Sequence, residues 1–434
     1  PANEHPDPFL DEPLRAALGL DQRLQREQAG LFYQAVTRSD RHLLITRPYL
    51  SEDGEKWEES TFWKAVQRLF SKEAVETVRP DDPQPLVEAA STQELLFTAV
   101  RRQSLPQRYD FLHERWNGLR HAREVVKARR AKHPKGPHEG YVEAIAPFME
   151  KRYSSEHTWS PSRLEYYGTC PYQFYIRTAL GLEARAAPQL GLEPGQLGSM
   201  LHKILEDTYR NASDPKDIEV VLSSLEIIAG QIFSDAPRQF GFRPSTLWEN
   251  EKAELLDKLR QTIQALVAET DWTPIEFEME FGKGDYPPLI IDLGAEVLRI
   301  RGVVDRVDRN SSGQLRVIDY KSGSMHLTAN DLKDGHRLQL PIYALAVRDA
   351  RQMGIPVEGI YWKILGAEAG SLKLSKFKTD TNQGVDAAIE VMMAHLVRIV
   401  NGIRSAEFPS KTPRVGCPSY CPGAQWCWRF EPEY

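Results

Sequence analysis

The sequence predicts an α/β protein in which a small mixed sheet lies between helices, preceded by a mainly helical region. Three observations support this fold class. Helical patterns fill the first third of the chain, short β-branched segments follow one another between residues 274 and 321, and helical patterns return after residue 337. A chain of 434 residues exceeds the size of one typical hydrophobic core, so we expect two domains.

The composition is that of a globular protein. Hydrophobic residues make up 41% and charged residues 27% of the chain, which excludes collagen-like, coiled-coil and wholly disordered classes. No apolar run is long enough to span a bilayer, and the first residues lack a signal-peptide pattern, so we expect a cytoplasmic protein. Because the chain begins with Pro1 rather than Met, we expect it to be cut from a longer polypeptide.

Residues 1–140 are expected to form the mainly helical region. A helical pattern within residues 13–49 gives way to a short apolar strand, His42 to Thr46. Further helices are expected at Ser60 to Phe70, Ser91 to Arg102 and Tyr109 to Arg130. Prolines and glycines between residues 134 and 140 then interrupt the pattern, and residues 141–159 are typical of a connector.

Residues 160–434 are expected to form the second domain, which contains the sheet. Its first helices are predicted at Pro161 to Leu180 and Gly195 to Tyr209, and long helices fill residues 214–270. The remaining predicted elements are four extended segments and two helices: Pro274 to Phe281, Leu289 to Leu293, Val297 to Asp308, Gln314 to Lys321, Leu338 to Arg348 and Val385 to Ile403.

Residues 301–323 are typical of a β-hairpin, because two β-branched runs flank a cluster of turn residues. We expect residues 311–313 to form a three-residue loop with Gly313 in the left-handed conformation. Asn310 then pairs with Gln314, and this pairing fixes the register of both strands.

The predicted register places charged residues opposite one another on both faces of the hairpin. Asp308 faces Arg316, which is an attractive pair, and on the other face Asp305 lies opposite Asp319. Because side chains alternate along a strand, Lys321 shares the face of the two opposed carboxylates.

Two opposed carboxylates destabilise a hairpin unless a cation lies between them. Mg²⁺ or Mn²⁺ would satisfy Asp305 and Asp319, and Lys321 lies close enough to stabilise a phosphoryl oxygen or to orient an attacking water. The alternative is an exposed hairpin with ordinary surface charges. Glu278, in the preceding extended segment, is an accessory candidate that we leave outside the predicted site.

The hairpin contains two of four motifs that follow one another in order along the chain. They are GxxxH at Gly198 to His202, GxxDRxD at Gly302 to Asp308, IDYKSG at Ile318 to Gly323 and QLPIY at Gln339 to Tyr343. Together they resemble the RecB and AddB branch of the PD-(D/E)xK nuclease superfamily, whose core has a restriction-endonuclease-like fold. The resemblance implies a DNA nuclease.

The resemblance also implies a role for each motif residue. It implies that His202, Asp305 and Asp319 are metal ligands. It implies that Lys321 is catalytic and that Gln339 and Tyr343 flank the site. Taken alone, a helix histidine or a polar pair spaced by four residues is commonplace on amphipathic helices.

The four cysteines of the chain are Cys170, Cys417, Cys421 and Cys427. A chain without a signal sequence disfavours disulfides, and a set of one remote and three clustered thiols is typical of a four-thiolate metal site. The alternatives are zinc, an iron–sulfur cluster or free buried thiols.

The cysteine pattern resembles the [4Fe-4S] site of AddB-type nucleases. The match is imperfect, because Cys417 and Cys421 form CxxxC where that family usually has CxxC. The resemblance implies a cluster that joins the two ends of the nuclease domain and stabilises the fold rather than carrying electrons.

The N-terminal region carries a second, shorter resemblance. The helix-to-strand segment with Thr37 and Arg38 is similar to the last conserved motif of superfamily 1 helicases. No GxxxxGK[ST] motif occurs, so a helicase motor is expected upstream in the full-length chain or in a partner subunit. The alternative is a helix followed by a core strand in an unrelated fold.

The charge distribution gives a mixed indication about DNA. The net charge of −6 is unlike that of a passive DNA binder. A local basic run could nevertheless follow a DNA backbone, or form the solvated face of a helix. The run consists of Arg120, Arg123, Lys127, Arg129, Arg130, Lys132 and Lys135.

Taken together, the resemblances imply a metal-dependent nuclease that resects the single strand or duplex end of DNA within a helicase–nuclease of recombinational double-strand-break repair. Two alternatives remain at this stage. One is a free-standing, cluster-bearing nuclease of the CRISPR-adaptation type, which the helicase-like segment disfavours. The other is a non-catalytic DNA-end binding scaffold, which has no need for opposed carboxylates.

Overall fold

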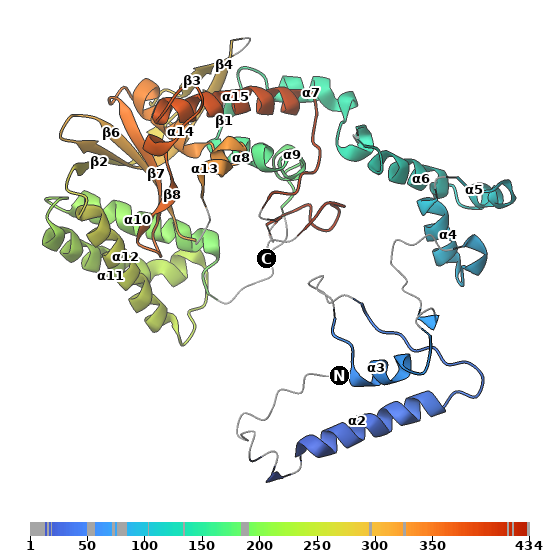
Figure 1. Cartoon of the computed structure of the whole chain (residues 1–434). Helices are drawn as coiled ribbons and strands as arrows, with labels where there is room; N and C mark the ends of the chain where they lie inside the picture. Colours follow the sequence, from blue (N-terminus) through green and yellow to red (C-terminus); the bar gives the residue numbers. More distant parts are fainter. Residues whose placement is uncertain are drawn as a thin grey trace. The chain divides into compact units, whose positions relative to one another are not determined.

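The structure is a computed structural model. It describes residues 14, 17, 18, 20–49, 57–71, 74, 75, 85–102, 104–132, 135–183, 191–294, 297–323, 327–414, 416–418 and 421–431. The chain divides into two compact units, Pro1–Thr98 and Ala99–Tyr434, which we describe separately (Figure 1). This division falls well before residue 140, where the sequence analysis expected the helical region to end.

The described part of the first unit is helical, with α2 as its longest helix. Its described elements are α2 (Leu20–Thr37), α3 (Thr61–Gln67), the 3₁₀ turn η2 (Leu86–Glu88) and most of α4 (Thr92–Arg101). Phe32 stacks on Phe62 with 4.8 Å between the ring centroids, which joins α2 to α3.

The strand predicted at His42 to Thr46 is not formed. These residues have no regular secondary structure, and the side chain of Leu44 is 86% exposed. A strand needs a neighbour to pair its backbone groups, and none is present in the described part of this unit.

The second unit is built from helices around two sheets. Its helices are α5 (Phe111–Arg115), α6 (Gly118–Arg129), α7 (Ala146–Arg152), α8 (Pro161–Thr169), α9 (Pro171–Phe174), α10 (Pro194–Asn211), α11 (Ile218–Phe240), α12 (Trp248–Val267), α13 (Ala329–Lys333), α14 (Gln339–Leu345) and α15 (Val385–Arg404). Shorter turns are η3 (Gln107–Tyr109), η4 (Pro137–Glu139), η5 (Glu143–Ile145) and η8 (Leu374–Lys376), and single π turns, η6 (Tyr175–Ala179) and η7 (Ala346–Ala350), extend α9 and α14.

Two predicted helices are each divided in the structure. The helix expected at 109–130 breaks at Trp116, which has an extended backbone between α5 and α6. The helix expected at 161–180 breaks at Cys170, also extended, because the ring of Pro171 disfavours helical geometry in the residue before it.

The main sheet has five strands in the order β2-β5-β6-β7-β8. The strands are β2 (Trp272–Phe281), β5 (Gly302–Asn310), β6 (Leu315–Lys321), β7 (Pro356–Lys363) and β8 (Glu368–Lys373). The β6–β7 pair is parallel and the other pairs are antiparallel, so the sheet is mixed, as predicted. A smaller sheet pairs β1 (Thr158–Trp159), β4 (Val297–Ile300) and β3 (Leu289–Asp292).

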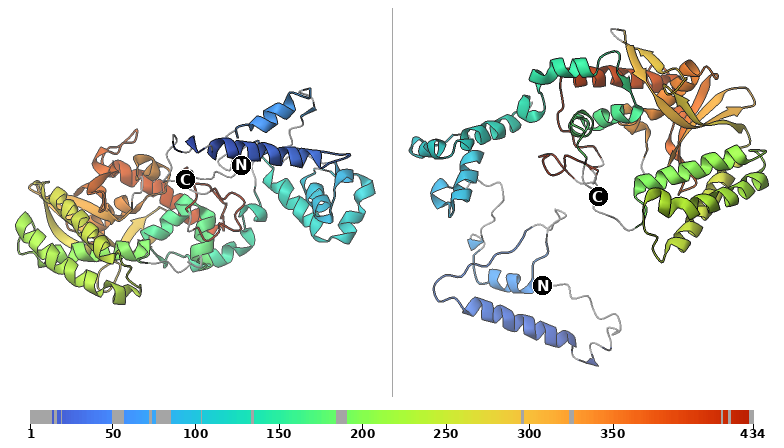
Figure 2. Two further views of the ribbon diagram at one scale, coloured as in Figure 1. Left: turned by 90° about the horizontal axis from the view of Figure 1, so that it is seen from below. Right: turned by 180° about the vertical axis from the view of Figure 1, so that it is seen from behind.

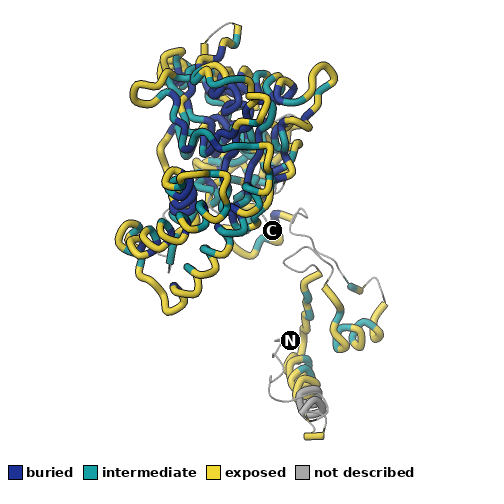
Figure 3. Tube along the Cα trace, turned by 90° about the vertical axis from the view of Figure 1, so that its left-hand side faces the viewer, coloured by how far each residue is buried: buried dark blue, intermediate teal, exposed yellow. Residues whose placement is uncertain are grey.

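Helices cover both faces of the main sheet (Figure 2). Helices α10 to α12 bury Ile318 and Tyr320 of β6 on one face, while Val317 of the same strand belongs to the core with α8, α14 and α15. Figure 3 shows that buried residues concentrate in this layered part of the second unit. Because β6 is buried on both faces, its polar end is held rigidly.

Residues 141–159, expected to form a connector, contain η5, α7 and β1. Met149, Tyr153 and Trp159 are almost completely buried and belong to the main core. Three large apolar side chains in nineteen residues bury too much surface for a solvated linker, so this segment is part of the second unit.

Among the described residues, no helix is both long and apolar enough to cross a membrane.

Candidate functional site

The hairpin has the predicted register. Asn310 N donates a hydrogen bond to Gln314 O at 2.9 Å, and Gly313 has a left-handed φ of 79°. Asp308 is the backbone partner of Arg316 in the β5–β6 ladder. The turn geometry therefore fixed the pairing, as the sequence indicated.

The face of the hairpin that carries Asp308 holds a buried ion-pair network. Arg316 Nη2 lies 2.6 Å from Asp308 Oδ2, and Arg306 Nε lies 2.5 Å from Asp308 Oδ1. All three side chains are at most 3% exposed. These pairs hold the two strands together beneath the opposite face, on which Asp305 lies.

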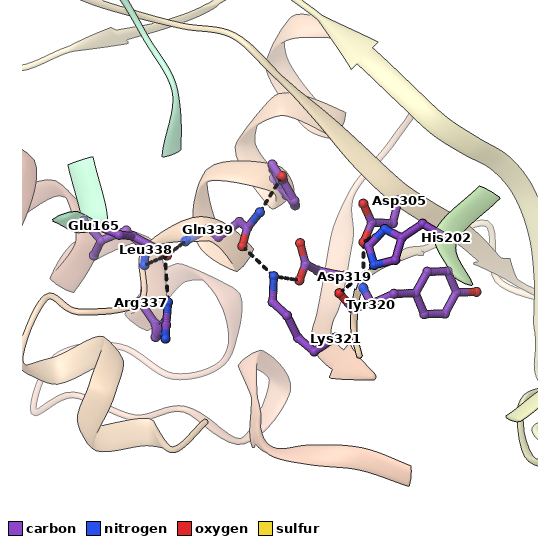
Figure 4. A network of polar contacts seen from close by, with 10 residues as sticks. Glu165, His202, Asp305, Asp319, Tyr320, Lys321, Arg337, Leu338 and Gln339 are labelled. Carbon is purple, nitrogen blue, oxygen red and sulfur yellow. Dashed lines mark hydrogen bonds and ion pairs between the residues drawn. The ribbon is translucent and has the colours of Figure 1, made fainter. Parts of the chain in front are cut away.

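Asp305 and His202 meet at the centre of this opposite face (Figure 4). Tyr320 N donates to Asp305 Oδ2 at 2.7 Å, and His202 Nδ1 lies 3.5 Å from the same oxygen. His202 Nε2 lies 3.1 Å from the carbonyl oxygen of Tyr320, which can only accept a hydrogen bond. A neutral imidazole that donates through Nε2 therefore turns an unprotonated Nδ1 toward the Asp305 carboxylate.

Gly198 allows α10 to approach the end of β6. A Cβ atom at this position would lie 3.3 Å from Ser322 Oγ, which is tighter than an ordinary contact. The first residue of the GxxxH motif thus has a packing role, while His202 one turn later faces the site.

Glu278 joins the site from β2. Its carboxylate, the His202 ring and the Asp305 carboxylate each offer one ligand atom within 4.8 Å of the others, the one such group of three found in the described part of the chain. Glu278 has a φ of 48°, a left-handed conformation that is strained for a residue with a side chain. The sequence analysis left this residue outside the site, since its position depends on the pairing of β2 with β5.

Burial and like charge perturb the ionisation of these groups. Burial first, and then the Asp319 charge, raises the pKa of Asp305 well above its ordinary value. Burial and the nearby Glu206 carboxylate raise the pKa of Glu278 to about 7. Burial lowers the pKa of His202, which keeps the imidazole neutral. The crowded carboxylates therefore favour a cation.

The remaining predicted residues form one chain of contacts. Lys321 Nζ lies 2.5 Å from Asp319 Oδ2 and donates to Gln339 Oε1 at 3.2 Å. Gln339 Nε2 in turn donates to the Tyr343 hydroxyl at 2.7 Å. Burial opposes the charged form of Lys321, but the carboxylates of Asp319, Asp305 and Glu165 together raise its pKa, so this side chain is an ammonium.

The buried carboxylates and the His202 imidazole of this site fit a divalent metal ion. Asp319 is 2% exposed, and its Oδ2 makes an ion pair but no hydrogen bond. Among the described residues, the group of possible ligand atoms within 4.8 Å of one another is that of His202, Glu278 and Asp305, and it does not include Asp319. Carboxylates and a neutral imidazole are ligands that a divalent metal ion accepts in proteins.

We expect Asp305→Asn to raise the free energy of unfolding in EDTA at neutral pH by up to about 1 kcal/mol, the typical size for opposed like charges. The amide still accepts the Tyr320 N–H bond, but the charge is gone. Because the folded-state pKa of Asp305 is raised, its carboxylate form opposes folding above that pKa, so the gain should disappear in acid. Urea denaturation at both pH values measures this.

Asp308→Asn on the same strand is the matched control. Asp308 is paired with two buried arginines, so the same substitution should lower stability by about 3–5 kcal/mol. A clear loss of metal-free stability in Asp305→Asn would contradict the proposed crowding of carboxylates.

The four cysteines are free thiols, of which Cys170 follows α8 and the other three lie near the C-terminus. Cys170 ends α8, and Lys411 N donates to its sulfur at 3.5 Å. Burial first, and then the charges of the other three thiols, raises the pKa of Cys421. A Cβ atom on Gly423 would lie 2.8 Å from the Tyr172 ring, so the C-terminal loop packs beside Cys170.

The basic run contributes partly to structure. Arg129 lies over the Trp428 ring at 5.1 Å and 3.6 Å from Glu139, and Arg130 Nη1 donates to Arg101 O at 2.6 Å. These contacts join the end of α6 to the cysteine-bearing loop and to Arg101 within the second unit. Whether the basic run binds DNA stays a prediction.

The chain belongs to the PD-(D/E)XK nuclease superfamily, which it matches over residues 158–428. This match covers the whole layered sheet and the motifs on its polar edge, and it confirms the nuclease fold that the sequence analysis expected.

The chain is also similar to bacterial proteins that are named as one of the subunits of an ATP-dependent helicase/deoxyribonuclease. It is 27% identical to that of Caldanaerobacter subterraneus over 398 residues, covering 82% of this chain and 33% of the relative. It is 26% identical to that of Clostridioides difficile, covering 75% and 30%. It is 30% identical to that of Clostridium novyi, covering 52% and 22%. The chain therefore spans about a third or less of the length of these relatives.

Proposed function

We propose that the chain is a Mg²⁺- or Mn²⁺-dependent deoxyribonuclease that hydrolyses phosphodiester bonds at DNA ends, within a cytoplasmic helicase–nuclease of recombinational repair. The observation that carries the proposal is the close approach of Asp305 on β5 to the end of β6, where Tyr320 N donates to the Asp305 carboxylate and Asp319 pairs with Lys321. The names of the similar proteins support the same substrate and the association with a helicase.

In this proposal His202, Asp305 and Asp319 hold the metal ion, and Glu278 is an accessory carboxylate. When bound, the metal ion would supply Lewis acidity at the phosphate and would activate a water for attack. The ammonium of Lys321 stabilises charge on a phosphoryl oxygen. Gln339 accepts from Lys321 and so fixes the direction of the ammonium, while Tyr343 fixes the Gln339 amide.

We further propose that the four cysteines hold a [4Fe-4S] cluster. Burial of Cys170 and Cys421 and the mutual influence of all four thiols support a common site. None of the close ligand groups found among the described residues contains a cysteine, so the choice of a cluster over zinc rests on the resemblance of the cysteine pattern.

The partner in this proposal is a helicase motor, upstream in the full-length protein or in another subunit. Thr37 and Arg38 end α2, where Thr37 Oγ1 donates to Tyr33 O at 2.7 Å. The helicase-like assignment of residues 1–140 and the nuclease limits of 160–434 stay predictions. The names of the relatives disfavour the CRISPR-type alternative, because they refer to subunits of a helicase/deoxyribonuclease. The presence of Asp305, Asp319 and Lys321 disfavours the scaffold alternative.

Cleavage of a single DNA strand labelled at its 5′ or 3′ end tests the proposal. We expect degradation with Mg²⁺ or Mn²⁺ and none in EDTA. The pattern of labelled products then gives the polarity. A protein that binds the strand but never cuts it with either metal is a scaffold, and the proposal is wrong.

A further inference from the structure

Glu165 on α8 is a buried carboxylate that the predicted site does not include. Its side chain is 8% exposed. Glu165 Oε1 accepts hydrogen bonds from Leu338 N at 2.7 Å and Gln339 N at 2.9 Å, and Arg337 Nη1 lies 3.4 Å from Oε2 (Figure 4). Both carboxylate oxygens are thus directed at the residues that begin α14.

These contacts compensate for a missing cap. The N-cap residue of α14 is Leu338, whose side chain has no acceptor for the first amide groups of the helix. Glu165, distant in sequence, supplies that acceptor and a negative charge that favours the helix start. The backbone of Gln339 is therefore held by α8 rather than by its own helix.

The side chain of Gln339 points the other way, into the site. Its Oε1 accepts from Lys321 Nζ, and its Nε2 donates to Tyr343. One residue therefore joins Glu165, through its backbone, to the ammonium of Lys321, through its side chain.

We propose that Glu165 is a positioning residue for phosphodiester hydrolysis, acting through Gln339 to hold Lys321 where the phosphate is attacked. This inference rests on the proposed function. Glu165 donates nothing to the reaction and touches neither His202 nor the two aspartates in the described contacts.

Glu165→Ala should lower kcat by roughly 10²-fold, because a displacement of about 1 Å in a catalytic group has an effect of that size. The KM for DNA and the metal concentration at half-maximal rate should not change. Glu165→Gln keeps a carbonyl oxygen for the Leu338 and Gln339 amides, so it should retain most of the kcat.

A double-mutant cycle with Gln339→Ala separates positioning from general damage. If Glu165 acts only through Gln339, the Glu165→Ala/Gln339→Ala protein should be no slower than Gln339→Ala alone. Effects that multiply would overturn the inference. A Glu165→Gln variant as slow as Glu165→Ala would also overturn it.

Tyr167→Phe is the matched control on the same helix. Tyr167 is 4% exposed, and its hydroxyl donates to Glu407 O at 2.7 Å, away from α14. This variant should lower Tm and leave kcat unchanged. Equal losses of kcat in Tyr167→Phe and Glu165→Ala would instead show that the integrity of α8 alone matters.

Hydrogen exchange of the metal-free protein measures the protection of the amides at the start of α14 and needs no activity assay. Glu165→Ala should remove protection at the amides of residues 338 and 339, and Tyr167→Phe should not. A wild-type protein that cuts no DNA refutes the proposed function and this inference with it. An active wild type with unchanged protection in Glu165→Ala refutes the inference alone.

Discussion

Asp319→Ala and Lys321→Ala should each abolish DNA cleavage while the protein stays folded and binds DNA. Asp319 contributes a buried carboxylate to the proposed metal site, and Lys321 contributes the ammonium beside it. We expect the single-turnover rate to fall at least about 10³-fold for Asp319→Ala, since a metal ion supplies several kcal/mol of transition-state stabilisation. For Lys321→Ala we expect about 10²–10³-fold, as for removal of one oxyanion donor.

The chain offers a close control for the lysine. Lys363 is the backbone partner of Lys321 across β6 and β7, but its ammonium pairs with the exposed Glu368 at 3.0 Å. Lys363→Ala removes the same charge from the neighbouring strand and should cleave at the wild-type rate. Wild-type rates in Asp319→Ala or Lys321→Ala, with saturating Mg²⁺ or Mn²⁺, would end the nuclease assignment.

The hairpin could be predicted because its information is local. A three-residue loop ending in Gly313 fixes the pairing of Asn310 with Gln314, and the alternation of side chains then determines the face of every later residue. The geometry of Asp305, Asp319 and Lys321 follows from twenty consecutive residues.

The positions of Glu278 and Glu165 depend on longer-range contacts. Glu278 reaches the site because β2 pairs with β5 and because its backbone is left-handed, neither of which its neighbours in sequence specify. Glu165 contacts a helix 174 residues later in the chain. Strand β7 was missed for the same reason, since it is fixed by parallel pairing with β6 rather than by a hairpin turn, and β8, which pairs with β7, was missed with it.

The local sequence pattern was also misleading where a segment had no tertiary packing partner. Residues His42 to Thr46 have the composition of a core strand but no strand to pair with in the described part of the first unit. Conversely, residues 141–159 were expected to form a connector, yet Tyr153 and Trp159 stack at 5.1 Å within the core. In both cases the structure of the segment depended on whether it is buried against a packing partner, and not on its local composition.

The cysteines should make anaerobically purified protein brown, with broad absorbance at about 400 nm from iron–thiolate charge transfer, whereas a zinc site would leave it colourless. Cys421→Ala should lose iron and lower Tm by roughly 5 °C or more, because each kcal/mol of lost stability lowers Tm by about 2–4 °C in a domain of 150–250 residues. The physical reason is that metal-binding free energy is also folding free energy, so opening the site frees the loop that packs on Tyr172.

The same variant tests how the thiols affect cleavage. Helix α8 carries Glu165 and ends at Cys170, so a loosened cysteine site should slow cleavage only through the position of α8 and its neighbours. Asp319→Ala is the control, since it should lose cleavage but keep its iron, colour and Tm. Iron content, absorbance and thermal unfolding measured on both variants separate structure from chemistry. Colourless, iron-free protein with full stability after Cys421→Ala would reject the cluster and zinc together, and would leave four ordinary thiols.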